Sequence, residues 1–247
     1  MATPGNEESS VDAEKPALGR DKLQIILVGT EVQASFRVPL ETFFTTSKYF
    51  TALCSDRWKR PADEVLRLPD IEPRIFNVYC GWQEHEHIDL AYLNLGNTGF
   101  PDATEARCDV LIRAYALGDM VLDVNFRDTV VDRVASMVSG GGRISSAANV
   151  TTLYDLVPRR SKLALLFVVD WSHRRYGMRI YRDHLSDMPQ DFVVEIAMYC
   201  IRRQHLHHLP RGPIDNCRYH EHESVEAAAL LDTSTALEVA AQKRGIA

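Results

Sequence analysis

The sequence of 247 residues predicts an α+β fold, in which a small sheet containing a hairpin is flanked by helices. Three observations predict it. Apolar and polar side chains alternate from Val32 to Val38, as in a strand with one buried face. A nearly continuous apolar run, Leu23 to Val28, precedes that segment across the turn Gly29-Thr30-Glu31. From Pro73 onward, apolar residues recur at helical rather than strand spacing.

The second strand should end at Pro39, because proline lacks a ladder donor and suits the first turn of a helix. Two short helices are expected next, and Ser47 is suited to cap the second one. Their apolar positions are Leu40, Phe43, Phe44, Phe50 and Leu53. A core that includes Phe36, Phe50 and Leu53 follows from this pattern.

A third strand is expected around Val65 to Leu68, after a loop at Trp58 to Pro61. A helix should begin near Pro73, with one apolar side formed by Ile75, Phe76, Tyr79, Cys80 and Trp82. From Thr104 the chain is again helical, with a buried stripe formed by Ala106, Val110, Leu111, Ala114, Leu117 and Val121. Another helical pattern covers Val124 to Val138, and the glycines in Ser139 to Arg143 mark a domain boundary because grouped glycines disfavour helix.

The order of these segments resembles the BTB/POZ domain, particularly its fungal stand-alone members. The residues that carry the resemblance are Phe36-Arg37-Val38, then SKYFTAL from Ser47 to Leu53, then the apolar-x-Leu-Pro segment ending at Pro69. Ala116 to Asp119, followed by Phe126, Val130 and Val131, continues it. The likeness covers roughly residues 22 to 138 and depends on the ordered set rather than on any single piece. Where the family has a His and a basic residue after the second strand, this chain has Pro39 and Leu40.

The resemblance divides the chain into four parts. Residues 1–20 are polar and are expected to be a disordered arm, and residues 21–138 form the BTB/POZ-like domain. Residues 150–203 resemble the helical extension that follows the module in fungal relatives, through Thr151 to Val157, Leu163 to Tyr176 and the Pro-x-x-Phe at Pro189. Residues 204–247 are His-rich and then Ala-rich, and are expected to be disordered.

Composition excludes several classes of protein. The net charge of −6 argues against a nucleic-acid partner, because phosphate binding needs clustered Lys and Arg. The five cysteines are irregularly spaced and include no C-x-x-C, so we expect no disulfide framework. No signal peptide is visible and no apolar run is long enough for a membrane span. These features predict an intracellular protein of the cytoplasm or nucleus, without membrane contact.

The candidate metal site is a cluster of His and Cys near the C-terminus. It comprises His205, His207, His208, Cys217, His220 and His222. The spacing matches no closed zinc finger, so we predict no bound metal; His85 and His87 are weaker candidates still. The segment Gly140 to Arg143 lacks the lysine and serine or threonine of a P-loop. The basic loop Arg57-Trp58-Lys59-Arg60 is interpreted as solvated surface.

No catalytic constellation occurs, so the sequence predicts neither an enzyme nor a cofactor. The resemblance instead implies a protein-protein interaction or adaptor protein. One alternative is a substrate adaptor of a cullin-type ubiquitin ligase, whose hydrophobic-x-acidic contact would fall at Val110-Leu111-Ile112, where the acid is missing. Another is a BTB-containing transcription or chromatin factor, against which the acidic balance and the lack of C-x-x-C pairs both argue.

The N-terminal arm also bears on assembly. Many animal BTB proteins exchange an N-terminal helix and strand between two subunits. Residues 1–20 offer only isolated apolar positions at Val11, Ala17 and Leu18. We therefore predict that a homodimer of this chain would not be strand-exchanged.

Overall fold

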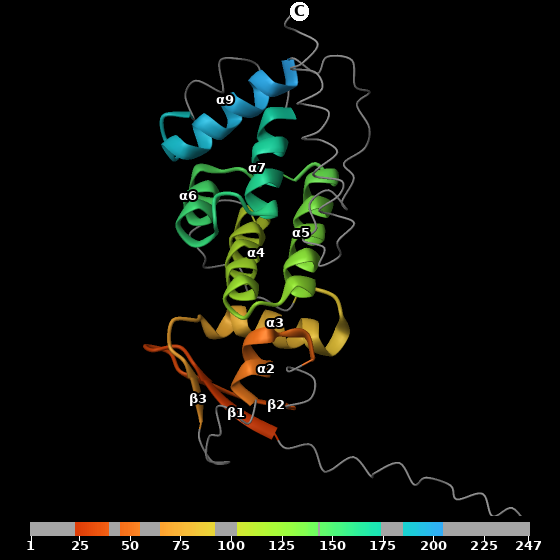
Figure 1. Cartoon of the computed structure of the whole chain (residues 1–247), viewed down its shortest axis with the longest axis vertical. Helices are drawn as coiled ribbons and strands as arrows, with labels where there is room; N and C mark the ends of the chain where they lie inside the picture. The colour runs from red at the N-terminus through yellow and green to blue at the C-terminus, as the bar shows by residue number, and fades with distance from the viewer. Residues whose placement is uncertain are drawn as a thin grey trace, which may run out of the picture.

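The computed structural model describes residues 23–39, 45–54, 65–91, 103–142, 144–173 and 185–204. A three-stranded sheet lies at one end of the molecule and helices extend from it to the opposite end (Figure 1). The predicted α+β class is confirmed. The arm at 1–20, the first short helix with Phe43 and Phe44, the loop Arg57 to Arg60 and the His-rich cluster lie outside the described residues.

The sheet has the strand order β2-β1-β3, with β1 (Leu23–Val28) in the centre. Strand β2 (Ala34–Pro39) pairs antiparallel with β1, and β3 (Leu66–Leu68) pairs parallel with it. The second strand ends at Pro39 and the third lies where the sequence predicts. Ile26 and Val28 of the central strand are almost completely buried.

The predicted start of the second strand at Val32 is wrong. Val32 is 75% exposed and lies in the connection between the strands, because pairing begins only at Val28 and Ala34. Gly29 opens this connection with a φ of 91°, and a Cβ at that position would lie 2.4 Å from the carbonyl oxygen of Val32. The chain folds back so tightly here that Val32 cannot continue the ladder.

Helix α2 (Lys48–Cys54) begins after Ser47, whose Oγ accepts a hydrogen bond from the N–H of Phe50 at 3.2 Å. The predicted cap is therefore present. Phe50 is 1% exposed, while Phe36 and Leu53 are half-buried against the same core. Helix α3 (Pro73–His85) begins at the predicted proline. The ring of Phe76 in this helix packs edge-on against the ring of Phe36 in β2, with the ring centroids 4.9 Å apart.

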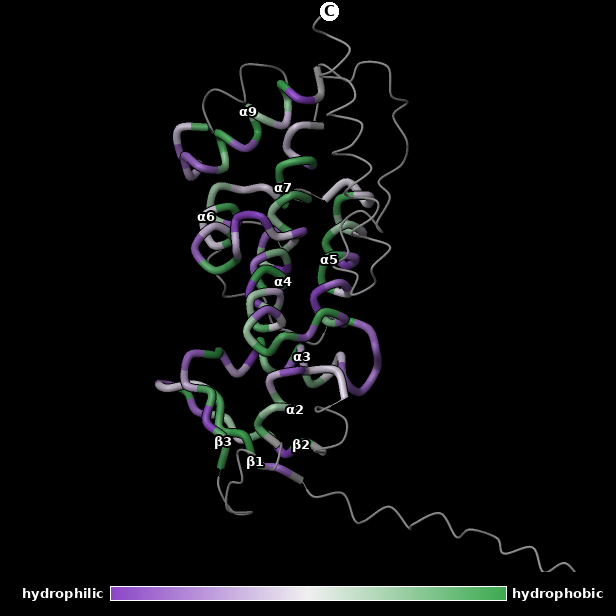
Figure 2. The backbone as a smooth tube through the Cα atoms, viewed as in Figure 1, coloured by the Kyte–Doolittle hydropathy of each residue, from purple (hydrophilic) through white to green (hydrophobic). Residues whose placement is uncertain are grey.

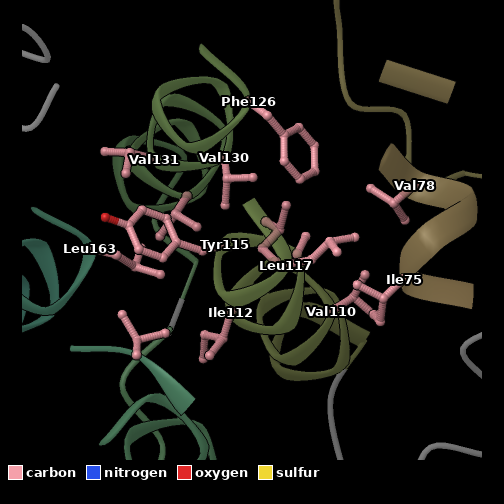
Figure 3. Packing of buried hydrophobic residues seen from close by; sticks show 14 of the residues in the cluster. Ile75, Val78, Val110, Ile112, Tyr115, Leu117, Phe126, Val130, Val131 and Leu163 are labelled. Carbon is pink, nitrogen blue, oxygen red and sulfur yellow. The ribbon is translucent and has the colours of Figure 1, made fainter. Parts of the chain in front are cut away.

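Helix α4 (Ala103–Met120) is the central element, and α5 (Val124–Ser139) packs beside it. The sequence predicts one buried stripe on α4, but Cys108, Asp109, Ile112 and Tyr115 are buried as well. The reason is that other helices surround α4, so a single apolar face is not enough. Figure 3 shows side chains of α4 meeting Ile75 and Val78 of α3, Phe126, Val130 and Val131 of α5, and Leu163.

Three further helices follow α5: α6 (Ala147–Leu156), α7 (Lys162–His173) and α9 (Gln190–Gln204). Their buried residues join the same hydrophobic cluster as the sheet and α3 to α5. Asn149 of α6 donates to the carbonyls of Glu105 and Ile144, which joins α6 to the beginning of α4. In the described part of the chain, none of the helices combines the length and apolar character of a membrane span.

Candidate functional site

The connection between α4 and α5 is a tight turn with a leucine at its critical position. The N–H of Leu122 donates to the carbonyl of Asp119 at 3.2 Å, and the N–H of Asp123 donates to that of Gly118 at 2.9 Å. These two bonds form a Schellman motif, whose left-handed residue is usually glycine. Here that residue is Leu122, with a φ of 54°.

Leu122 is both strained and exposed. The left-handed conformation costs an L-residue with a Cβ roughly 1–2 kcal/mol. The side chain does not regain this by burial, since it is 51% exposed and the neighbouring Met120 is 43% exposed. The exposed side chain does not offset this cost, and such outliers concentrate at functional positions. The turn between α4 and α5 is therefore our candidate functional site.

Helix α2 is fastened to this turn at its first residues. The Oγ of Ser47 donates to the carbonyl of Val121 at 2.6 Å, and the N–H of Tyr49 donates to the same carbonyl at 3.3 Å. Ser47 thus caps α2 and joins it to the end of α4 with one hydroxyl group. This double use fixes the distance between Leu122 and the exposed start of α2.

A hollow of about 410 Å³ lies between α2 and the turn. Its walls combine hydroxyl groups with a few apolar side chains, and its lining residues are Thr45, Thr46, Ser47, Lys48, Thr51, Ala52, Leu122, Val124 and Asn125. The hollow is partly open to solvent. Small molecules usually bind in pockets that enclose most of their surface, so this hollow is better suited to one or two side chains of a protein partner.

A buried polar network lies near the hollow and holds its walls together. Asp123 is 0% exposed; its carboxylate accepts from the N–H of Phe126 at 3.1 Å and from the hydroxyl of Tyr79 at 2.9 Å. Gln83 donates to the hydroxyl groups of Thr46 and Tyr79, at 2.7 and 3.0 Å. Burial, with the charge of Asp123 adding to it, raises the pKa of Tyr79, so the phenol stays protonated as a donor.

A second polar cluster joins α3 to α4. The side chain of Asp109 is only 5% exposed, and its carboxylate forms ion pairs with the guanidinium groups of Arg113 at 2.9 Å and Arg74 at 3.7 Å. The carboxylate of Glu72 also pairs with both arginines, at 3.0 Å from Arg113 and 2.6 Å from Arg74. The four charges sum to zero and pair with one another, so this cluster serves to hold the helices together.

The histidines His85 and His87 lie at the end of α3. Their rings are 5.8 Å apart, and His85 is 3.8 Å from Glu84. Within the described ranges, no group of three or more His, Cys, Asp and Glu could hold a metal ion. Burial, with Glu84 adding to it, raises the pKa of the nearby Cys80 thiol to about 12, which makes it a poor nucleophile.

The three residues at which a cullin contact was expected are buried. Val110, Leu111 and Ile112 are all 0% exposed, in the middle of α4. They cannot meet a partner while the fold is intact. The glycines at 140–142 follow the end of α5, and the N–H of Gly142 donates to the carbonyl of Met137 at 2.9 Å.

Sequence reasoning missed Leu122 and Met120. It treated Val121 as the last residue of a buried stripe, and Val121 is buried, but the exposed leucine beside it drew no attention. A usable signal was present, because a helix ending without a glycine or asparagine at the left-handed position is a departure from the usual chemistry. Recognising it requires knowing where α4 ends, to within one residue.

The fold and the site together define an α+β protein with a strained apolar turn beside a partly open hollow. A comparison with protein-family models and a search of curated proteins find no match to this chain.

Proposed function

We propose that this protein is a non-catalytic interaction or adaptor protein built on a BTB/POZ-like module. The order of strands and helices supports this proposal, because a hairpin, a third strand and successive helices follow one another as the resemblance implies. The observation that carries it is the exposed Leu122 in a left-handed conformation. Binding a partner is the role in which this side chain would be buried and its strain offset.

The geometry indicates what such a partner would present. Leu122 offers an apolar contact of limited area at the edge of the hollow, where Ala52 and Val124 are among the lining residues. Interfaces of this kind place an apolar anchor at the centre and hydrogen bonds at the rim. The partner is then a protein that places an apolar side chain against Leu122.

The test compares two glycine substitutions at left-handed positions. Leu122→Gly removes both the strain and the apolar contact, so the variant should lose the partner without losing stability. Glu86→Gly is the matched control, since Glu86 ends α3 with a φ of 55° but has a charged side chain instead of an apolar one. Affinity capture from native cell extract should yield a protein that the wild type and Glu86→Gly retain and Leu122→Gly does not.

Direct titration of the captured protein completes the experiment. We expect at least about a tenfold weaker Kd for Leu122→Gly, corresponding to roughly 1.4 kcal/mol, while Glu86→Gly matches the wild type. Capture of the same proteins by all three forms would show that the turn is not the binding surface. The cullin-adaptor and chromatin-factor alternatives stay predictions, since no described contact favours either one.

A further inference from the structure

Helix α9 is apolar on two sides, and one of them packs on the core. Phe192 is 0% exposed, and Val193, Ile196 and Tyr199 pack half-buried against the hydrophobic cluster. The ring of Phe192 lies 5.7 Å from that of Tyr154 and 6.2 Å from that of Trp171. This side anchors α9 to α6 and α7.

The other side of α9 faces solvent although it is also apolar. Val194 is 52% exposed, Met198 46% and Ile201 51%, and Ala197 between them is exposed as well. Figure 1 places α9 at the end of the molecule farthest from the sheet, and Figure 2 shows apolar positions along it. An apolar helix face is normally buried against another element, so this second face of α9 lacks a partner within the described residues.

The spacing of the exposed residues fits helix pairing. Val194, Met198 and Ile201 are separated by four and then three positions, the alternation of a coiled-coil seam. In that pattern Glu195 and Arg202 occupy equivalent positions along the same side of the seam. One acid therefore precedes the centre of the seam and one base follows it.

These charges select the direction of pairing. In two antiparallel copies centred near Met198, Glu195 of one copy faces Arg202 of the other, and the arrangement repeats by symmetry. In two parallel copies the facing positions are Gln190 and Ala197, which carry no charge. The hydroxyl of Tyr154 on α6 donates to the Glu195 carboxylate at 2.7 Å and so restrains its position.

We propose that α9 is the contact surface between two copies of this chain, packed antiparallel about a two-fold axis near Met198. Met198 of each copy then lies near the axis with Val194 and Ile201 on either side of it, and two Glu195–Arg202 pairs flank the seam. The seam is three side chains long in each copy, well below the area of a permanent dimer. The dimer is accordingly reversible, with dissociation on dilution.

Sedimentation velocity on the full chain between about 1 and about 200 µM tests this, since small interfaces dissociate in that range. The wild type should pass from monomer to dimer. Met198→Glu places two carboxylates at the centre of the seam and should abolish the dimer. Leu156→Glu is the matched control, because Leu156 is an apolar residue of α6, 45% exposed and off the seam, and it should dimerise normally.

Charge exchange tests the antiparallel direction separately. Arg202→Glu should weaken the dimer roughly threefold to tenfold, because each of two surface pairs becomes a repulsion. The double variant Glu195→Arg with Arg202→Glu restores opposite charges across the axis and should recover most of the wild-type Kd. A monomeric wild type at every concentration, or a dimer that tolerates Met198→Glu, would overturn the proposal; a double variant no tighter than Arg202→Glu would overturn the antiparallel arrangement.

Discussion

Asp123 shows how one buried residue organises the surroundings of the candidate site. The donors that reach its carboxylate, from Tyr79, Gln83 and the N–H of Phe126, carry no formal charge. The carboxylate lies at the N-terminus of α5, where the helix dipole favours a negative charge. It therefore serves as a helix cap and as the acceptor for α3 at the same time.

Replacing Asp123 with Ala should lower the free energy of unfolding by about 2–4 kcal/mol, because a cap is lost and buried donors lose their acceptor. Urea unfolding measures this. Ser146→Ala is the control, since Ser146 caps α6 by accepting from the N–H of Asn149, and its loss should cost about 1 kcal/mol. Equal losses in the two variants would mean that Asp123 acts only as a cap.

At the scale of elements, α4 and α5 approach each other closely at Gly118. A Cβ built there would lie 2.8 Å from Cγ of Arg127 and 3.0 Å from Cδ1 of Phe126. Arg127 is held in place by Asp119, at 2.7 Å, and Phe126 is fully buried. Both neighbours are therefore restrained at the start of α5.

Gly118→Ala should therefore destabilise the protein by about 1–3 kcal/mol, although alanine favours helix over glycine by about 1 kcal/mol. Thermal unfolding followed by circular dichroism measures the change. Gly140→Ala is the control, because its Cβ would lie 3.4 Å from the carbonyl oxygen of Ser136, close to ordinary contact, and its effect should stay within about 0.5 kcal/mol. A Gly118→Ala variant as stable as the wild type would show that α5 adjusts freely.

The elements that the sequence predicts well are those with local signals. Ser47 and Pro73 mark helix starts through their own chemistry, and both starts are confirmed. The burial of Cys108 and Tyr115 on the far side of α4 was not predictable in this way, because it depends on helices distant in the sequence. Exposure of the α9 face was missed for the same reason: its apolar residues look like core until the packing leaves them outside.

The whole molecule carries its two proposed contact surfaces at opposite ends. Helix α2, to which the Leu122 turn is fastened, lies toward the sheet, and α9 lies at the far end (Figure 1). A contact between two copies through α9 would thus leave both hollows accessible. Such a dimer would present two equivalent surfaces to a partner, and a partner with two matching sites would bind it with increased avidity.

This arrangement predicts that residues 1–19 are dispensable for self-association. The strand β1 is already paired on both sides, by β2 and β3, so an added strand could pair only at an outer edge of the sheet. The arm also lacks a continuous apolar segment that could serve as an exchanged strand.

A chain that begins at Arg20 should give the same monomer–dimer curve by light scattering as the full chain, whereas Met198→Glu should remove the dimer from both. If deleting the arm converted a stable dimer into a monomer, the arm would be the exchanged element, and strand exchange would hold the two copies together.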